Sequence, residues 1–151
     1  MNSELAAAIQ EIRGNRALVS IDEACTKAGV VLRLLSTLGW NPFNVEEVKP
    51  EFTLGAKRVD YSLRIANTNK VFFEVKRIGE NLEPHQEQLL GYSFQQGVRL
   101  AVLTNGATWW FYLPLNEGAW ASVLRQMKLL PKTSLLLHNF SYWGGALSQP
   151  P

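Results

Sequence analysis

The chain has 151 residues, of which 46% are hydrophobic and 19% are charged, and its net charge is +2. These values predict one soluble globular domain over residues 1–151, and the mild positive charge permits an anionic partner without requiring one. The single cysteine, Cys25, excludes an internal disulfide and is typical of a protein in the reducing cytoplasm. No stretch of about 18 apolar residues is present, so we expect no membrane-spanning segment. The start at Met1–Glu4 lacks the features of a signal peptide.

Apolar residues at helical spacing predict two helices in the first part of the chain. The first covers Ser3–Arg13 and ends at Gly14, and the second begins at Ser20 and ends near Leu38. Glu23 lies in the first turn of the second helix and has two interpretations. It can form a capping box with Ser20, or it can act as a functional carboxylate, and the two roles are compatible.

Two segments in which apolar and polar residues alternate predict an antiparallel hairpin. They are Val59–Ile65 and Val71–Arg77, and turn-forming residues at 67–69 join them. A short strand at Phe52–Leu54 is expected before the hairpin.

The polar face of this hairpin gathers two acids and an amine. If the apolar residues of both strands share one face, a short loop predicts that Asp60 lies opposite Lys76. The same register sets Ser62 opposite Glu74 and makes Asp60 a diagonal neighbour of Glu74, about 7–8 Å away at the backbone. Two carboxylates at that spacing can share one cation. The alternative is a cross-strand ion pair between Asp60 and Lys76 on a solvated face, which contributes little stability.

The remainder of the chain predicts further helices and strands in alternation. The expected elements are a helix from Pro84 to Gly97, strands at Val98–Leu103 and Ala107–Leu113, a strand or helix around Ser122–Leu130, and a helix over Ser134–Trp143. The turn at Thr104-Asn105-Gly106 joins the two strands into a second hairpin. This order predicts an α/β (mixed α+β) fold in which one mixed sheet is flanked by helices.

Asp60, Glu74 and Lys76 together offer the groups that phosphodiester hydrolysis needs. Two carboxylates provide hard oxygen ligands, which suit Mg²⁺ or Mn²⁺ better than zinc. Such an ion can activate water, and Lys76 can orient that water or balance negative charge in the transition state. His85 and His138 lack the spacing of a zinc site, and we interpret them as ordinary surface or core residues.

The pattern Asp60…Phe73-Glu74-Val75-Lys76 resembles the Asp…Glu-x-Lys core of the PD-(D/E)XK, or restriction-endonuclease-like, nucleases. Further motifs are similar to those of the nuclease domain at the N-terminus of type I restriction enzyme R subunits: Leu38-Gly39-Trp40, Pro50-Glu51, Asp60-Tyr61, Gln88-x-x-x-Tyr92 and Thr104-Asn105-Gly106. The resemblance extends from Glu23 to Leu113.

The resemblance implies a restriction-endonuclease-like core and roles for particular residues. Asp60 and Glu74 would be metal ligands, and Lys76 would be the catalytic lysine. Gln88 and Tyr92 would form the Gln-x-x-x-Tyr element, and their spacing places them on one helix face. Without the family, a Tyr92 in the core and a Gln88 in solvent explain this pair equally well.

The resemblance also implies a role for Glu23, because such nucleases often carry an acidic residue on the first helix. The chain departs from the family in two respects. Val59 stands where the broad family has a proline. The chain also contains no Gly-x-x-x-x-Gly-Lys-Ser/Thr loop, so we expect neither an ATP site nor a translocating motor.

These observations lead to the hypothesis of a metal-dependent endonuclease that hydrolyses DNA. Lys57, Arg58 and Arg77 lie at the same open end of the hairpin as Lys76, and their position alone assigns them to the phosphate backbone. A homodimer is expected if both strands are cut, because each chain has one site. Two alternatives remain, a non-catalytic nucleic-acid-binding module of the same fold and a protein–protein adaptor that uses exposed aromatic residues. The run Trp109–Tyr112 can stack bases, although core packing is the favoured interpretation.

Overall fold

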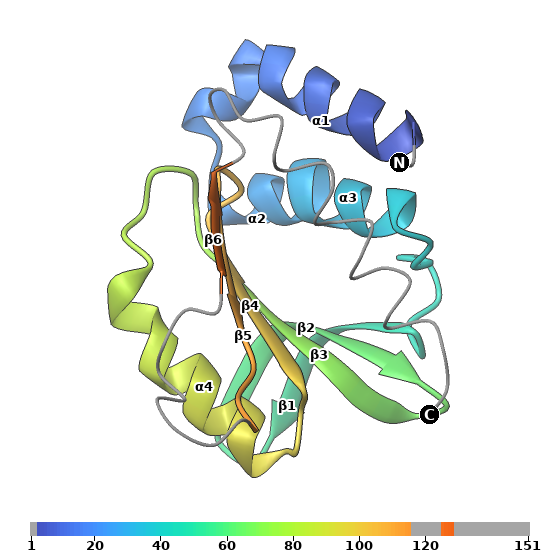
Figure 1. Cartoon of the computed structure of the whole chain (residues 1–151), viewed down its shortest axis with the longest axis vertical. Coiled ribbons are helices and arrows are strands. Elements are labelled where there is room, and N and C mark those ends of the chain that lie inside the picture. The colour runs from blue at the N-terminus through green and yellow to red at the C-terminus, as the bar shows by residue number, and fades with distance from the viewer. Residues whose placement is uncertain (1–2, 116–124, 129–151) are drawn as a thin grey trace.

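The computed structural model describes residues 3–115 and 125–128, which form a six-stranded mixed sheet with helices on both faces (Figure 1). In chain order the elements are α1 (Ser3–Gly14), η1 (Arg16–Ser20), α2 (Glu23–Thr26), η2 (Lys27–Val31), α3 (Leu32–Thr37), β1 (Val48–Leu54), β2 (Lys57–Ile65), β3 (Thr68–Val75), η3 (Glu83–His85), α4 (Gln86–Gln95), β4 (Leu100–Thr104), β5 (Thr108–Tyr112) and β6 (Arg125–Lys128). The strands lie side by side in the order β1-β2-β3-β4-β5-β6. All neighbours are antiparallel except β3 and β4, which α4 connects as a parallel crossover. The predicted mixed sheet flanked by helices is confirmed.

Two hydrophobic clusters hold the helices on opposite faces of the sheet. Ile9 of α1 and Leu34 of α3 belong to the same cluster as Phe73 of β3, whereas Leu90 of α4 belongs to the cluster of Phe72. Phe72 and Phe73 are consecutive in one strand, so their side chains point to opposite faces. Burying a side chain of this size contributes about 1.5–3 kcal/mol. The central strand β3 therefore fixes both helical layers, and the polar residues at its end are held by a rigid support.

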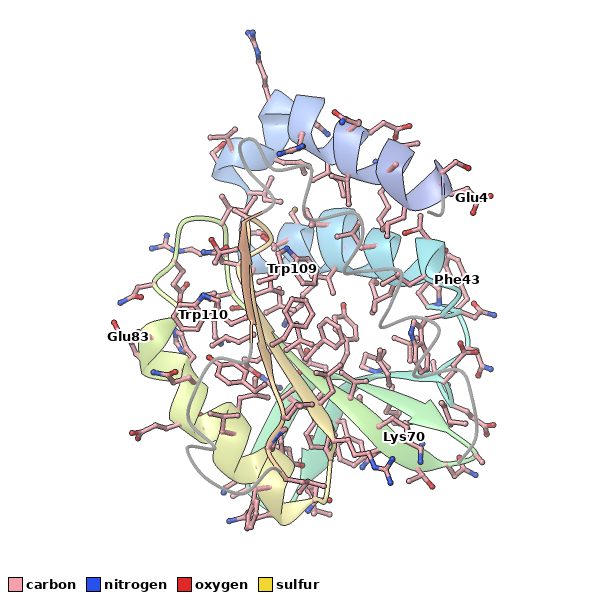
Figure 2. The ribbon with its side chains drawn as sticks, viewed as in Figure 1. Glu4, Phe43, Lys70, Glu83, Trp109 and Trp110 are labelled. Atoms are coloured by element: carbon pink, nitrogen blue, oxygen red, sulfur yellow. The ribbon has the colours of Figure 1, made fainter. Side chains whose placement is uncertain are left out.

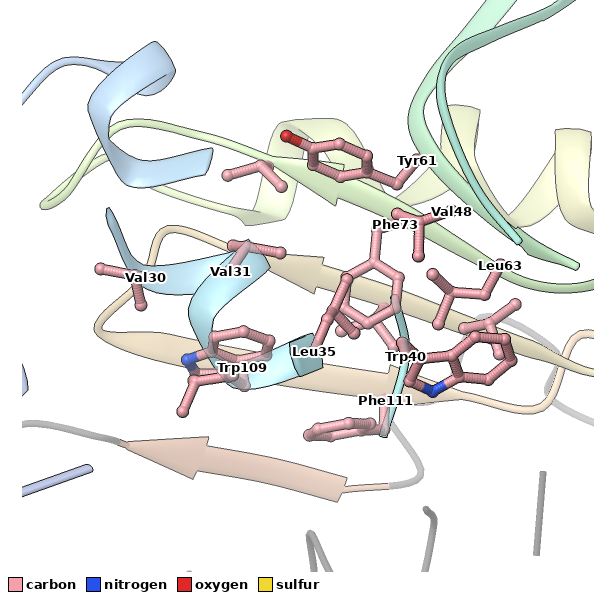
Figure 3. Packing of buried hydrophobic residues seen from close by; sticks show 14 of the residues in the cluster. Val30, Val31, Leu35, Trp40, Val48, Tyr61, Leu63, Phe73, Trp109 and Phe111 are labelled. Carbon is pink, nitrogen blue, oxygen red and sulfur yellow. The ribbon is translucent and has the colours of Figure 1, made fainter. Parts of the chain in front are cut away.

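The aromatic residues of β5 are core residues. Trp109 and Phe111 pack in the cluster beneath α1 and α3, while Tyr112 lies in the α4 cluster and Trp110 packs against that cluster (Figures 2 and 3). The ring of Trp109 meets Phe73 edge to face, with 6.4 Å between ring centroids. The predicted core packing is confirmed, so base stacking by the buried rings is excluded.

The second predicted helix is present, but it begins later than expected and contains an irregular turn. The chain forms a 3₁₀ turn up to Ser20, and the helix then runs through α2, η2 and α3, with a π-helical turn in η2. Its N-cap is Asp22, whose Oδ1 accepts a hydrogen bond of 2.7 Å from the backbone N–H of Cys25. The capping box between Ser20 and Glu23 was therefore a wrong prediction, because the adjacent Asp22 supplies the cap.

The β2–β3 hairpin has the predicted faces but a different register. Tyr61 pairs with Phe73 and Ser62 pairs with Phe72, so Asp60 lies level with Glu74 and not opposite Lys76. The turn is formed at 66–67, where both residues have positive φ angles of 48° and 61°. A bulge interrupts the pairing of the two strands between Leu63 and Arg64, just before the turn in the chain. This tight turn comes earlier in the chain than the predicted turn at 67–69. Between the turn and the bulge Ile65 pairs with Thr68, and the bulge adds one residue before Leu63 pairs with Val71. The register beyond the bulge therefore differs from the predicted one by two residues. Tyr61, Leu63, Val71 and Phe73 keep their common face, whereas Val59 packs in the opposite cluster.

The other predicted elements differ mainly in their ends. The first strand is longer than Phe52–Leu54, since β1 begins at Val48. The third helix begins with the 3₁₀ turn that contains Pro84, as predicted, and β6 lies within the predicted segment 122–130. The helix predicted over 134–143 lies outside the described residues.

Gly106 fixes the β4–β5 turn against the helix that carries part of the candidate site. Its φ angle is +79°, and an added Cβ would lie 2.9 Å from Cγ2 of the buried Thr26. We therefore expect Gly106→Ala to lower the free energy of unfolding by about 1–3 kcal/mol, measured by chemical denaturation. Gly91→Ala is the matched control, since nothing lies within 4 Å of its Cβ position in α4 and alanine favours a helix. Equal effects of the two changes would contradict this close contact.

Candidate functional site

The sheet opens at the point where Asp60 meets the end of β3. Beyond Tyr61 the β2–β3 pairing ends, and the backbone N–H of Val75 donates a hydrogen bond of 2.6 Å to Asp60 Oδ2. The backbone N–H of Lys76 instead bonds to the carbonyl oxygen of Thr104, at 2.7 Å, so the end of β3 stays with β4. The carboxylate thus takes the place of a backbone partner from β2, while Val75 stays paired with Thr104 of β4. This contact fixes one oxygen of a buried acid between two separating strands.

The edge strand β1 is irregular at the same level. Pro50 pairs with Tyr61 and Phe52 with Val59, which leaves Glu51 beside Asp60. Glu51 has a φ angle of +49°, in the left-handed region that non-glycine residues rarely adopt. Strain of this kind persists where the surrounding structure holds it, and it concentrates at functional sites.

Most of the predicted site residues line one cleft of about 530 Å³ at this opening in the sheet. Its lining comprises Glu23, Thr53, Ala56, Arg58, Asp60, Glu74, Lys76 and Gln88. A smaller adjoining cleft of about 140 Å³ is lined by Lys57 and Tyr92, together with Glu74, Lys76 and Gln88. Helices from both faces and three strands therefore contribute to one polar depression.

Glu74 and Lys76 form a hydrogen-bonded ion pair within the cleft. The distance from Lys76 Nζ to Glu74 Oε1 is 2.7 Å, and both side chains are largely buried. Burial, together with the nearby Asp60 carboxylate, raises the pKa of Glu74 above its usual range. Burial opposes the charge on Lys76, but the bond to Glu74 and the neighbouring acids outweigh it and raise the pKa of this amine. Lys76 is therefore a cation at neutral pH.

Lys27 is a site residue that the sequence did not reveal. Its ammonium lies 2.5 Å from Asp60 Oδ1, 3.0 Å from Glu23 Oε1 and 3.6 Å from Glu51 Oε1. Burial opposes its charge, but Asp60 and Glu23 raise the pKa of Lys27 well above the ordinary value. The Glu23–Lys27 spacing of four on one helix was the available clue, because it places the amine on the same face as the predicted acid.

Gln88 and Tyr92 lie on one face of α4, and they have different surroundings. Gln88 lines both clefts. Tyr92 is buried and its ring stacks on Phe72 with centroids 5.2 Å apart. Its hydroxyl group makes no hydrogen bond of good geometry, although it lies near the backbone of Leu54, and burial raises its pKa. Tyr92 thus supports the wall of the smaller cleft from within the core.

The three basic residues predicted to contact the phosphate backbone of DNA do not all lie at the clefts. Lys57 bonds to Gln95 at 3.1 Å, and Arg58 pairs with Glu51 at 2.9 Å while its side chain remains 66% exposed. Arg77 does not line either cleft, and its side chain is 70% exposed beside Glu80 at 3.5 Å. Lys57 and Arg58 border the clefts, whereas Arg77 lies outside them.

Comparison with known proteins identifies a likeness in structure but none in sequence. No protein-family model and no curated protein matches the chain. One solved structure with a similar fold is a chain from a cryo-electron microscopy structure of a DrdV–DNA complex, with a TM-score of 0.55 and 10% sequence identity. The match covers 99% of this chain and 14% of the DrdV chain. This likeness shows the fold.

The donor groups of the cleft fit a magnesium-type site of few protein ligands. Among the described residues, no group of three or more His, Cys, Asp or Glu side chains is arranged to hold a metal ion. Asp60 and Glu74 remain as two neighbouring carboxylates, and Mg²⁺ is commonly held by one or two carboxylates while it keeps several waters. A closed zinc site would need more ligands of another kind.

None of the helices in the described part of the chain has the length and apolarity that crossing a membrane requires.

Proposed function

We propose that this chain is a Mg²⁺- or Mn²⁺-dependent endonuclease domain that hydrolyses DNA, related to the PD-(D/E)XK nucleases and to the nuclease domain of type I restriction R subunits. The observation that carries the proposal is the meeting of Asp60, Glu74 and Lys76 in one cleft where β2 and β3 separate. The similarity in fold to a protein solved in complex with DNA supports a DNA substrate.

The proposed roles follow from charge and position. Asp60 and Glu74 would hold the divalent ion, which when bound supplies Lewis-acid stabilisation and an activated water. Lys76 is cationic and held by Glu74, so its ammonium can orient the attacking water or stabilise negative charge on the phosphoryl oxygens. Water then forms a new P–O bond as the bond to the leaving oxygen breaks.

The surrounding residues would bind and orient the substrate. Lys57 and Arg58 border the clefts and are suited to phosphate contacts, and Gln88 presents an amide to the same space. Arg77 is assigned to DNA beyond the cleft, because its side chain is exposed on the segment that follows β3. A homodimer would supply a second active site for the opposite strand.

Metal removal tests the proposal directly. We expect the protein to nick or linearise supercoiled plasmid with Mg²⁺ or Mn²⁺ and to lose this activity in excess chelator, because two carboxylates alone cannot activate water as a bound ion does. Agarose-gel analysis of plasmid forms over time measures the effect. Asp60→Asn is the control for contaminating nucleases. Cleavage that survives the chelator or this substitution would contradict the proposal.

A non-catalytic nucleic-acid-binding module is a second candidate, and one contact favours it. Lys27 Nζ lies 2.5 Å from Asp60 Oδ1, so the proposed ligand already has a cationic partner within the protein. Binding to DNA without cleavage, weakening steeply as salt concentration rises, would favour this module. The adaptor hypothesis cannot use the rings of Trp109, Phe111 and Tyr112, because these side chains are buried. Phe43 and Phe94 are exposed aromatic residues that remain available to a partner protein.

A further inference from the structure

Lys27 is held in the candidate site by an irregular helix. It begins the π-helical turn Lys27–Val31, and its side chain is only 17% exposed. π-turns inside helices are rare and occur frequently at functional sites. The two valines of this turn, Val30 and Val31, are fully buried against the sheet and hold the turn in place (Figure 3). Packing of the core therefore holds the backbone that carries Lys27 in place at the candidate site.

Both oxygens of Asp60 already have partners inside the protein. Oδ2 accepts the Val75 N–H at 2.6 Å, and Oδ1 faces the Lys27 ammonium at 2.5 Å. Oδ2 is tied to the backbone, so Oδ1 is the oxygen that a divalent ion would take. An ammonium and a metal ion that both contact Oδ1 would repel each other strongly, even with the high effective dielectric of a protein surface.

Lys27 has other carboxylates within reach. Glu23 and Glu51 lie 3.0 Å and 3.6 Å from its ammonium, and their side chains are 41% and 49% exposed, compared with 8% for Asp60. The flexible lysine stem can swing its charge between neighbouring acceptors. Moving away from Asp60 would therefore leave Lys27 paired, and closer to solvent.

We infer that Lys27 competes with the divalent cation for Asp60 Oδ1, and that metal binding moves its ammonium onto Glu23 and Glu51. This inference rests on the proposed metal ligands. It assigns Lys27 as a positioning residue that keeps the Asp60 carboxylate paired and sets the metal concentration at which the site loads. Glu23 then serves as an acceptor for the displaced lysine.

Metal affinity without DNA tests the inference. Titration calorimetry with Mg²⁺ or Mn²⁺ alone should show Lys27→Gln binding on the order of tenfold tighter, or more, than the wild type, because the competing charge is gone. Lys70→Gln is the matched control, since it removes one positive charge on β3 near the hairpin turn (Figure 2), and Lys70 lines neither cleft. Adding Asp60→Asn to Lys27→Gln should abolish the gain. Equal or weaker binding by Lys27→Gln, or no binding by any of these proteins, would overturn the inference.

A second measurement uses the unmodified protein and does not depend on how the variant folds. In the NMR spectrum of lysine side-chain groups, titration with Mg²⁺ should shift the Lys27 signal and leave the Lys70 signal in place. Saturable metal binding with an unmoved Lys27 signal would overturn the inference.

Binding and cleavage separate this inference from the proposed function. Tighter metal binding by Lys27→Gln, with no cleavage by any form of the protein, would retain the inference and reject the nuclease. Unchanged metal affinity, with cleavage that depends on Asp60, would reject the inference and retain the nuclease.

Discussion

Asp60→Asn is expected to lower metal-dependent DNA cleavage on the order of a thousandfold while the protein stays folded. The amide keeps the size of the carboxylate, and its oxygen can still accept the hydrogen bond from Val75. It cannot supply a negative charge to a divalent ion, and it removes the carboxylate that lies nearest to the Lys27 ammonium. The stability loss should be limited to about 1–2 kcal/mol, since Glu23 still pairs with Lys27. Initial rates of plasmid nicking and thermal unfolding measure the two effects.

Asp22→Asn provides the matched control for this substitution. Asp22 is the N-cap of α2, where asparagine caps about as well as aspartate, so the same chemical change should leave the fold unaltered. DNA binding at low salt should be similar for both variants and the wild type, because no phosphate-contacting residue is changed. A loss of cleavage in Asp22→Asn equal to that in Asp60→Asn would show that the effect is not specific to the site.

The sequence predicted those features that depend on regular periodicity. Alternation along Val59–Ile65 and Val71–Arg77 identified the hairpin and its buried face, which the common cluster of Tyr61 and Phe73 confirms. The same alternation placed Asp60 and Glu74 on one edge, and they line one cleft. This juxtaposition survived because the bulge beside the turn restored an even shift of two residues, whereas the turn at 66–67 alone would have placed the two apolar sets on opposite faces.

Local irregularities account for what could not be predicted. The register followed from a turn with left-handed residues at Ala66 and Asn67, and Asn67 alone was a residue type that favours this conformation. The strained backbone of Glu51 and the π-turn that begins at Lys27 have no period that a sequence pattern reveals. These irregular points bring Lys27 and Glu51 to Asp60. The family resemblance predicted a role for Glu23, which lines the cleft, but Lys27 was recognised as its partner only in the structure.

A substitution at Glu74 should separate catalysis from stability. The raised pKa of Glu74 arises first from burial and then from repulsion by Asp60, and it means that ionising this carboxyl group is less favourable in the folded protein than in the unfolded chain. Glu74→Gln supplies a neutral side chain of the same shape. We expect this variant to lose metal-dependent cleavage on the order of a thousandfold, because a proposed ligand is removed, while its unfolding midpoint at neutral pH lies at or above that of the wild type.

The pH dependence gives the sign of this effect. A carboxyl group with a raised pKa in the folded state favours folding when it is protonated, and this contribution is lost as pH rises through the folded pKa. The stability advantage of Glu74→Gln should therefore be present at neutral pH and disappear as the pH falls towards the ordinary glutamate value. Thermal unfolding of both proteins across this range measures it, with Glu87→Gln on α4 as the control, because Glu87 lines neither cleft. A variant that is less stable than the wild type at neutral pH would mean that the ion pair with Lys76 outweighs the burial of Glu74. The cleft would then be a stabilising charge cluster, without the strain expected of a site built to bind a metal ion.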